Sequence, residues 1–171
     1  MNEVPLFETW DQLSPIILPF IVRCGVAALC GAIIGFEREL RRKPAGFRTN
    51  ILICLGSAIY MGVGLLLVGL GEPNTDHTRI AAQVVSGIGF IGAGAILQSG
   101  GRITGLTSAA TIWVVASIGL IAGAGYTLLA LLSSWMVVVT LAALGGLERR
   151  FFDPVIADDA PPANGPPAAR D

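Results

Sequence analysis

The chain has 171 residues and a formal net charge of −1, and 53% of its residues are hydrophobic while only 13% are charged. Soluble domains carry about 25% charged residues, so the composition excludes an ordinary soluble domain. From Ile103 to Leu147 there is no Lys, Arg, Asp or Glu. One membrane-spanning helix takes about 20 residues, so this run fits two of them. We therefore expect an integral membrane protein and no nucleic-acid partner.

The predicted fold is all-α, a polytopic transmembrane bundle of about five helices. Helices are expected because an open sheet would leave backbone groups unpaired in lipid, and the spans lack the alternation of a barrel. The five spans are predicted at Ile16–Phe36, Ile51–Leu70, Ile80–Leu97, Leu106–Ala122 and Thr127–Leu147. They make up a membrane domain of residues 16–150, between an outer segment of residues 1–15 and a disordered, proline-rich cytoplasmic tail of residues 151–171.

Charge in the loops predicts the orientation. The first eleven residues carry three acids and no basic residue, which does not fit a secretory signal. The loop of residues 37–50 holds five basic residues, whereas the loop of residues 71–79 holds only Arg79. Because basic loops face the cytoplasm, we expect the N-terminus outside and the C-terminus in the cytoplasm.

The first span contains a charge and a small-residue motif. Arg23 lies about seven residues into the span, where a charge is costly. We expect it to pair with Glu72 or Asp76, or to reach the outer headgroups. Gly31 and Gly35 form a GxxxG spacing, which lets helices approach closely.

The loop after the first span is dense in charges. Arg41, Arg42 and Lys43 are typical of a cytoplasmic loop. The remaining polar residues suit either a structural role or a binding site, with a Glu37–Arg48 pair and a cap of the second helix by Thr49 or Asn50. Glu37 and Glu39 point apart on a helix, so neither a metal nor a cofactor is expected. These candidate polar residues are Glu37, Arg38, Glu39, Arg48, Thr49 and Asn50.

The third span is rich in glycine. Gly87, Gly89 and Gly92 fit G-x-G-x-x-G, but no strand precedes them and no acid follows about 20 residues later, so a nucleotide site is not expected. Glycine on both faces predicts a helix at the centre of the bundle, although a broken helix lining a permeation path remains the alternative. The predicted packing glycines are Gly31, Gly35, Gly56, Gly87, Gly89, Gly92 and Gly94. Polar candidates on the third and fourth spans are Gln83, Ser86, Thr107 and Ser108.

Several stretches, in this order and spacing, resemble the MgtC/SapB family of bacterial inner-membrane proteins. They are GFERE (35–39), AGFRTN (45–50), AQVVSGIGFIGAGA (82–95) and TGLTSAATIW (104–113). The resemblance covers roughly residues 16–150. It maps the family's motif onto Glu37, Arg38, Glu39, Gly46, Arg48, Thr49, Gln83, Gly87, Gly89, Gly92, Gly94, Gly105, Leu106, Thr107 and Trp113.

The resemblance implies a regulator rather than an enzyme. Such proteins are linked to growth in low magnesium and, in pathogens, to virulence, and they act on membrane partners such as the ATP synthase or P-type transport ATPases. Many carry a C-terminal ACT-like domain, which we do not expect here because only the proline-rich tail follows Phe152. The alternative is a transporter or channel for a cation such as Mg²⁺ or for a small solute. Small-residue seams also favour a homodimer or higher oligomer in the bilayer.

Overall fold

The computed structural model describes residues 10–69, 76–99 and 102–151. The chain forms two compact units, residues 1–138 and residues 139–171. The first unit contains four helices and the beginning of a fifth, and the described part of the second unit is the rest of that fifth helix. Glu72, most of the expected outer segment and nearly all of the expected tail lie outside the described residues.

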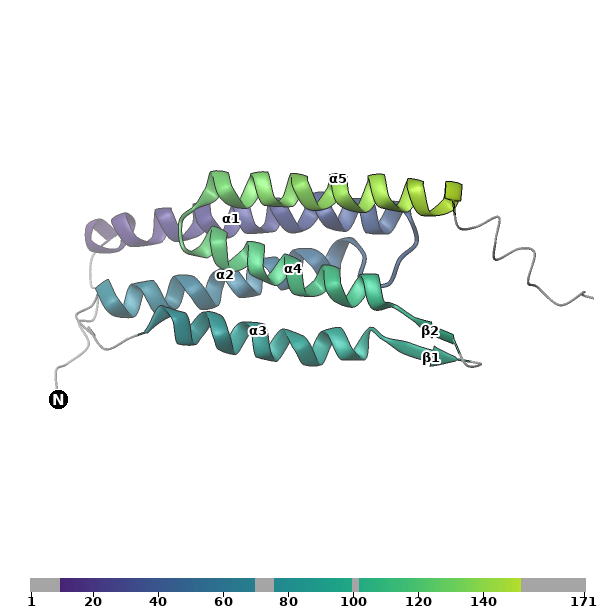
Figure 1. Ribbon diagram of the computed structural model, residues 1–171. Helices are drawn as coiled ribbons and strands as arrows, with labels where there is room; N and C mark the ends of the chain where they lie inside the picture. The colour runs from purple at the N-terminus through teal and green to yellow at the C-terminus, as the bar shows by residue number, and fades with distance from the viewer. Residues whose placement is uncertain (1–9, 70–75, 100–101, 152–171) are drawn as a thin grey trace, which may run out of the picture. The chain divides into compact units, whose positions relative to one another are not determined.

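Within the described residues the five predicted helices are all present, and a short hairpin that the sequence did not predict connects α3 to α4 (Figure 1). Their bounds are α1 Trp10–Leu40, α2 Phe47–Gly69, α3 His77–Gly94, α4 Leu106–Gly123 and α5 Thr127–Phe151, and the hairpin is β1 Leu97–Ser99 with β2 Arg102–Thr104.

Four of the five helices are long and apolar enough to cross a membrane. The candidate spans are Ser14–Leu40, Phe47–Leu67, Leu106–Gly123 and Thr127–Leu147. Helix α3 is the exception. It has 18 residues, as α4 does, but its first two turns contain His77, Arg79 and Gln83, which make it less apolar. The protein is therefore a multi-pass membrane protein by its helices.

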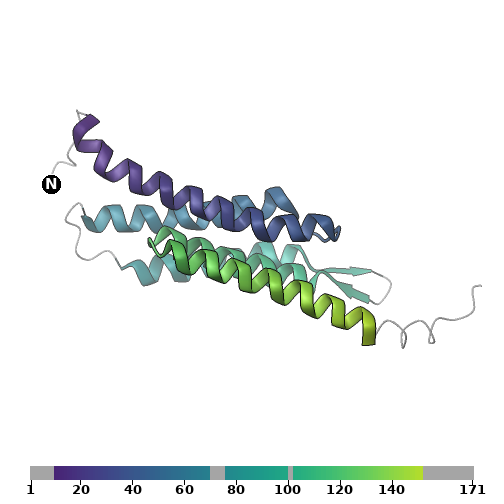
Figure 2. The same ribbon diagram turned by 90° about the horizontal axis from the view of Figure 1, so that it is seen from above.

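Helices α1, α2 and α4 pack against one another and enclose the core of the first unit (Figures 1 and 2). The buried side chains between them are mostly small, among them Ala27, Cys54, Ala58 and Ala116. Small side chains let helix backbones approach closely, which is the main source of helix association in lipid.

Helix α3 packs against α4 and α2 and leaves much of its surface uncovered. Phe90 is 85% exposed, and Ala82, Ser86, Gly89 and Ala93 are exposed as well. The prediction that α3 is central is therefore wrong for the single chain. We call these five residues the open face of α3.

The hairpin between α3 and α4 reverses the chain. Leu97 pairs with Thr104, and Ser99 pairs with Arg102, in an antiparallel register. Gly105 is the N-cap residue just before α4. Its φ of +90 favours glycine, and a Cβ there would collide with the Ala95 carbonyl oxygen. The expected third span, Ile80–Leu97, therefore ends three residues early as a helix, at Gly94.

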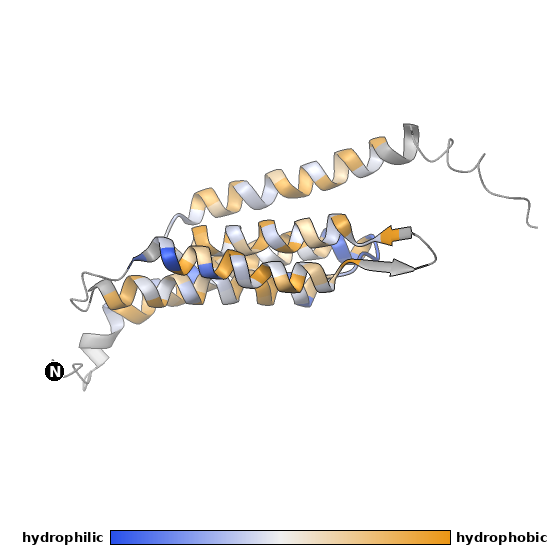
Figure 3. Ribbon diagram, turned by 60° about the horizontal axis from the view of Figure 1, so that its bottom comes forward, coloured by the Kyte–Doolittle hydropathy of each residue, from blue (hydrophilic) through white to orange (hydrophobic). Residues whose placement is uncertain are grey.

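The helices are mostly hydrophobic along their length (Figure 3). The strongest hydrophilic colour lies mainly near helix ends, whereas the outer surfaces carry exposed Leu, Ile, Val and Phe side chains. In water such a surface would drive association, but in a bilayer it contacts lipid chains.

Candidate functional site

A buried ion-pair cluster lies at the end of α1. Glu37 Oε2 is 2.6 Å from Arg38 Nε, and Glu37 Oε1 is 2.5 Å from Arg41 Nε. The Glu37 and Arg38 side chains are only 11% and 3% exposed. Glu37 thus pairs with two residues of its own helix end and not with Arg48, which is exposed. The expected bridge between the two helix ends is not formed by these residues.

Glu39 makes the contact between the helix ends instead. Its Oε2 accepts a hydrogen bond of 3.0 Å from the backbone N–H of Phe47, the first residue of α2. A carboxylate at a helix N-terminus is stabilised by the unpaired N–H groups and the helix dipole. A Cβ at Gly46 would collide with the same carboxylate oxygen, so a larger residue there would force the Glu39 side chain to move.

Arg48 and Thr49 are exposed beside this contact. Together with Phe36, Glu39, Gly46 and Phe47 they line a surface hollow of about 650 Å³. Neither residue caps α2, because the helix already begins at Phe47. Their positions at the surface suit contact with lipid headgroups or with a partner.

Asn50 is fully buried and ties α2 to the turn before it. Its Nδ2 donates to the carbonyl oxygens of Ala45, at 2.6 Å, and Gly46, at 2.8 Å. An N-cap side chain accepts a hydrogen bond from a backbone N–H, whereas the Asn50 side chain donates to carbonyls. Asn50 is therefore not the N-cap that the sequence suggested. Ala45 has a φ of +58, and the two bonds hold the turn in this unusual conformation.

The GxxxG motif of α1 packs inside the chain. A Cβ at Gly31 would be 2.6 Å from the Asn50 carbonyl oxygen, and one at Gly35 would be 2.8 Å from Phe47 Cα. Both glycines lie where α1 closely approaches α2. This face of α1 is therefore occupied and unavailable to a second copy.

Helix α4 carries two closely packed glycines, Gly119 and Gly123, which the sequence did not predict. A Cβ at Gly119 would collide with the Cys54 carbonyl oxygen, and one at Gly123 would be 2.5 Å from the Ala58 carbonyl oxygen. These two glycines are four residues apart, the same spacing as in α1. That spacing was the signal that could have found them.

The predicted packing glycines of α2 and α3 divide into two groups. Gly92 lies next to α4, where an added Cβ would be 3.7 Å from the Ala109 carbonyl oxygen. An added Cβ at Gly56, Gly87, Gly89 or Gly94 would meet nothing within 4 Å. These four positions leave space on the surface of the chain.

Arg23 lies at the other end of α4. Its Nη1 donates to the Gly123 carbonyl oxygen at 3.4 Å, and its guanidinium lies next to Gly125 in the turn that follows. The carbonyls at a helix C-terminus carry partial negative charge and attract cations. Asp76, which the sequence suggested as a partner, instead accepts hydrogen bonds from Thr78.

Asp76 is the N-cap of α3. Its Oδ1 accepts from the Thr78 backbone N–H at 2.8 Å and from Thr78 Oγ1 at 2.6 Å. These hydrogen bonds, with a smaller contribution from the charge of Arg79, lower the pKa of the Asp76 carboxyl. The side chain therefore stays ionised at neutral pH.

The hydroxyls of α4 face different surroundings. Ser108 and Thr111 are buried, and Thr111 Oγ1 donates back to the Thr107 carbonyl oxygen at 2.8 Å, whereas Thr107 itself is exposed.

Within the described ranges no three His, Cys, Asp or Glu side chains come together as a metal site.

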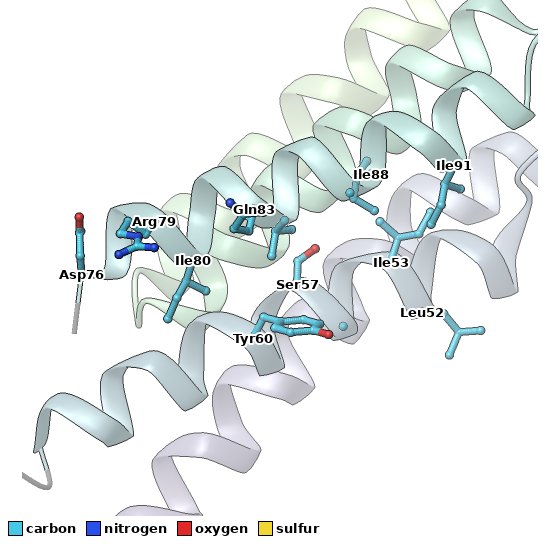
Figure 4. Close-up of a pocket in the computed structure, with 13 residues that line it drawn as sticks. Leu52, Ile53, Ser57, Tyr60, Asp76, Arg79, Ile80, Gln83, Ile88 and Ile91 are labelled. Atoms are coloured by element: carbon cyan, nitrogen blue, oxygen red, sulfur yellow. The ribbon is translucent and has the colours of Figure 1, made fainter. Parts of the chain in front are cut away.

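An elongated groove of about 820 Å³ runs between α2 and α3 (Figure 4). Asp76 and Arg79 lie at one end, and Ile53, Ile88 and Ile91 lie toward the other. Gly56 and Gly87 widen the groove because neither carries a side chain. The groove accommodates an amphipathic molecule better than a compact ion.

A model of the MgtC family matches residues 24–150. A protein of Escherichia coli strain K12 named "Putative magnesium transporter YhiD" is 44% identical over 138 residues, which are 78% of this chain and 64% of that protein. No solved structure matches.

Several relatives are named MgtC. Protein MgtC of Brucella abortus strain 2308 is 42% identical over 123 residues, 72% of this chain and 50% of the relative. Protein MgtC of Salmonella typhimurium is 43% identical over 110 residues, 64% of this chain and 46% of the relative. This chain thus spans between 46% and 64% of the length of the three relatives. Because the family model covers most of the chain, including α2, α3 and α4, this protein belongs to the MgtC family.

Proposed function

We propose that this chain is a multi-pass protein of the bacterial inner membrane that regulates other membrane proteins when magnesium is limiting. The link to magnesium is supported by the name of one relative, "Putative magnesium transporter YhiD". In pathogens the same role would serve virulence. Partners of the proposed kind are the ATP synthase and P-type transport ATPases.

The observation that carries the proposal is the open face of α3. Ala82, Ser86, Gly89 and Ala93 follow at spacings of four, three and four residues, and all are exposed. Small residues in this pattern allow a second helix to approach closely, and a serine hydroxyl can form a hydrogen bond across the contact. Phe90, 85% exposed beside them, adds a large apolar side chain for a partner helix.

A second copy of the chain is one occupant of this face, which gives a homodimer or a higher oligomer. The GxxxG face of α1 cannot serve, because α2 already covers Gly31 and Gly35. A probe that replaces the buried Ile34 is therefore not expected to crosslink two copies, whereas one on α3 is.

We further propose that all five helices cross the membrane, with the N-terminus outside. The support is the basic turn between α1 and α2, because short basic loops face the cytoplasm. Single cysteines in this turn and in the α3–α4 hairpin should then be labelled from the cytoplasmic side, and a cysteine just before α3 should be labelled from the outside. Labelling of the turn and the hairpin from the outside would overturn this orientation, and labelling of the two from different sides would show that α2 and α3 do not both cross.

Photo-crosslinking tests the regulatory role. A photoreactive amino acid replaces Ser86, and cells are grown in low and in replete magnesium. The regulator predicts a crosslink to a defined membrane enzyme whose activity changes when the chain is deleted. It also predicts that the Gly89→Leu protein still accumulates but neither crosslinks to this enzyme nor changes its activity. The same probe at buried Ile34 should give no crosslink.

The transporter alternative predicts a different result. Purified protein in liposomes would then move Mg²⁺ or a small solute, and a Gly89→Leu variant would keep this flux. Flux without any crosslinked membrane enzyme would replace the regulatory proposal.

A further inference from the structure

The groove between α2 and α3 has an amphipathic lining (Figure 4). Its volume of about 820 Å³ falls in the range of roughly 300–1,000 Å³ of small-molecule pockets, which are mostly apolar with a few placed polar groups. From Asp76 to Ile91 the groove follows α3 over ~22 Å, at 1.5 Å per residue. One leaflet of a hydrocarbon core about 30 Å thick measures ~15 Å. The groove is thus long enough for a headgroup and one acyl chain.

The two charges at one end of the groove are opposite. Arg79 supplies a guanidinium, whose planar set of N–H donors matches phosphate oxygens. Asp76 supplies a carboxylate three residues earlier on the chain, and its hydrogen bonds with Thr78 keep this carboxylate in place. A headgroup with one negative and one positive group complements this pair, whereas a headgroup with negative charge alone is repelled by Asp76.

Polarity then falls along the groove. Gln83 and Tyr60 follow the charged end, and Leu52, Ile53 and Ile91 line the far part. A lipid with its headgroup at the charged end would place its acyl chain along these apolar side chains. Helix α2, which forms one wall, is a candidate membrane span over Phe47–Leu67, so the wall has the composition of a surface that meets lipid.

The geometry points to a binding site for an aminophospholipid, with its phosphate on Arg79, its primary ammonium on Asp76 and one acyl chain between α2 and α3. The ammonium donates hydrogen bonds to the carboxylate, which a trimethylated choline headgroup cannot do. The site is separate from the open face of α3, since Gly87 lines the groove and Gly89 does not. It therefore does not depend on the proposed regulatory role.

Native mass spectrometry of the delipidated full chain in detergent tests this site. Three lipids with identical oleoyl chains are compared: phosphatidylethanolamine, phosphatidylcholine and phosphatidylglycerol. Phosphatidylethanolamine is expected to be retained about fivefold more than either of the others, which corresponds to about 1 kcal/mol. Equal retention of the three lipids would mean ordinary lipid contact and would overturn the site.

Two glycine variants locate the lipid. Gly87→Leu fills the groove and should reduce phosphatidylethanolamine retention at least fivefold. Gly89→Leu is the matched control, because its added side chain also meets open space but lies outside the groove, and it should leave retention unchanged. Unchanged retention in Gly87→Leu would overturn the proposal. The proposal would also be overturned if the lipid-free wild type were a dimer and Gly87→Leu were a monomer. A second copy of the chain would then fill the groove in place of a lipid.

A third variant keeps the test decisive if Gly87→Leu does not fold. Asn is as good an N-cap as Asp, so Asp76→Asn retains the start of α3 while removing the carboxylate. It should abolish the preference for phosphatidylethanolamine over phosphatidylcholine, because the primary ammonium then loses its hydrogen bonds to the carboxylate. A preference that survives this change would show that Asp76 does not bind the ammonium.

Discussion

Gly31 lies so close to Asn50 that a Cβ added to the glycine would be only 2.6 Å from the Asn50 carbonyl oxygen. Real Cβ atoms do not approach an oxygen this closely, so α1 and α2 would have to separate. Asn50 itself is fully buried and bonded to the turn between the same two helices. The pair therefore fixes both the distance between α1 and α2 and the path of the chain that joins them.

Gly31→Ala should destabilise the protein by about 1–3 kcal/mol, the usual cost of overpacking a well-packed site. Gly25→Ala is the control in the same helix, because an added Cβ there meets nothing within 4 Å and alanine favours a helix. Thermal unfolding in detergent measures both. A Gly31→Ala protein that melts with the wild type would contradict the close contact of α1 and α2.

Asn50→Ala should cost about 1–3 kcal/mol, because two buried backbone carbonyls lose their donor. Asn50→Asp should cost at least as much, since a carboxylate cannot donate to those carbonyls. The neighbouring Thr49→Ala provides the control because Thr49 is exposed. Equal melting temperatures for the Asn50 and Thr49 variants would show that the two hydrogen bonds add no stability.

The sequence predicted the five helices and their approximate ends because hydropathy and helical spacing are local properties. The GxxxG spacing likewise identified Gly31 and Gly35 as packing sites before their partner was known. The same spacing at Gly119 and Gly123 lies inside a long apolar run. Hydropathy there predicts a helix but does not show which of its faces packs against another helix.

Side-chain partners were harder to predict, because they depend on how the helices assemble. Glu37 pairs with Arg38 and Arg41, although a bond to Arg48 was equally compatible with the loop. The position of α3 could not be predicted either. Glycine on two faces is compatible with a helix at the centre of the bundle, and equally with a helix at its edge that leaves one face exposed. The hairpin was missed because its three-residue strands carry no alternating pattern long enough to recognise.

Glu37→Gln should be strongly destabilising, by roughly 3–5 kcal/mol, because it leaves the guanidinium of Arg38 buried without its counter-charge. Glu39→Gln should have a smaller effect, since its bond to the Phe47 N–H is exposed and glutamine can still accept it. The amount of folded protein after purification and the melting temperature both report the difference. The reverse order would show that the Glu39 contact is the more important one.

Arg23→Leu should destabilise the protein by about 0.3–2 kcal/mol, the range for a cation at a helix C-terminus. Arg23→Lys should recover part of this loss, because a lysine also brings a positive charge to the last carbonyls of α4. The melting temperatures of both variants in detergent measure the contribution of the contact with Gly123.

The Arg23 contact can be distinguished from a bridge to Asp76 by a double-mutant cycle. Without a bridge, the effects of Arg23→Leu and Asp76→Asn should add to within about 0.3–0.5 kcal/mol. A larger coupling, measured by thermal unfolding in one detergent, would mean that the two side chains interact after all.

The stability of the first turn of α3 should depend on pH in the acid range, because its N-cap is the carboxylate of Asp76. The folded-state pKa of Asp76 is lowered below its ordinary value of 3.8, so the carboxylate contributes stability that is fully present above that value. This contribution is lost as the pH falls through the lowered pKa of the folded state. Asp76→Asn should cap the helix almost as well at neutral pH and remove this part of the pH dependence. Hydrogen exchange of the first turn of α3 between about pH 2 and 6 measures the effect, and an identical pH profile in both proteins would show that Asp76 does not cap the helix as a carboxylate.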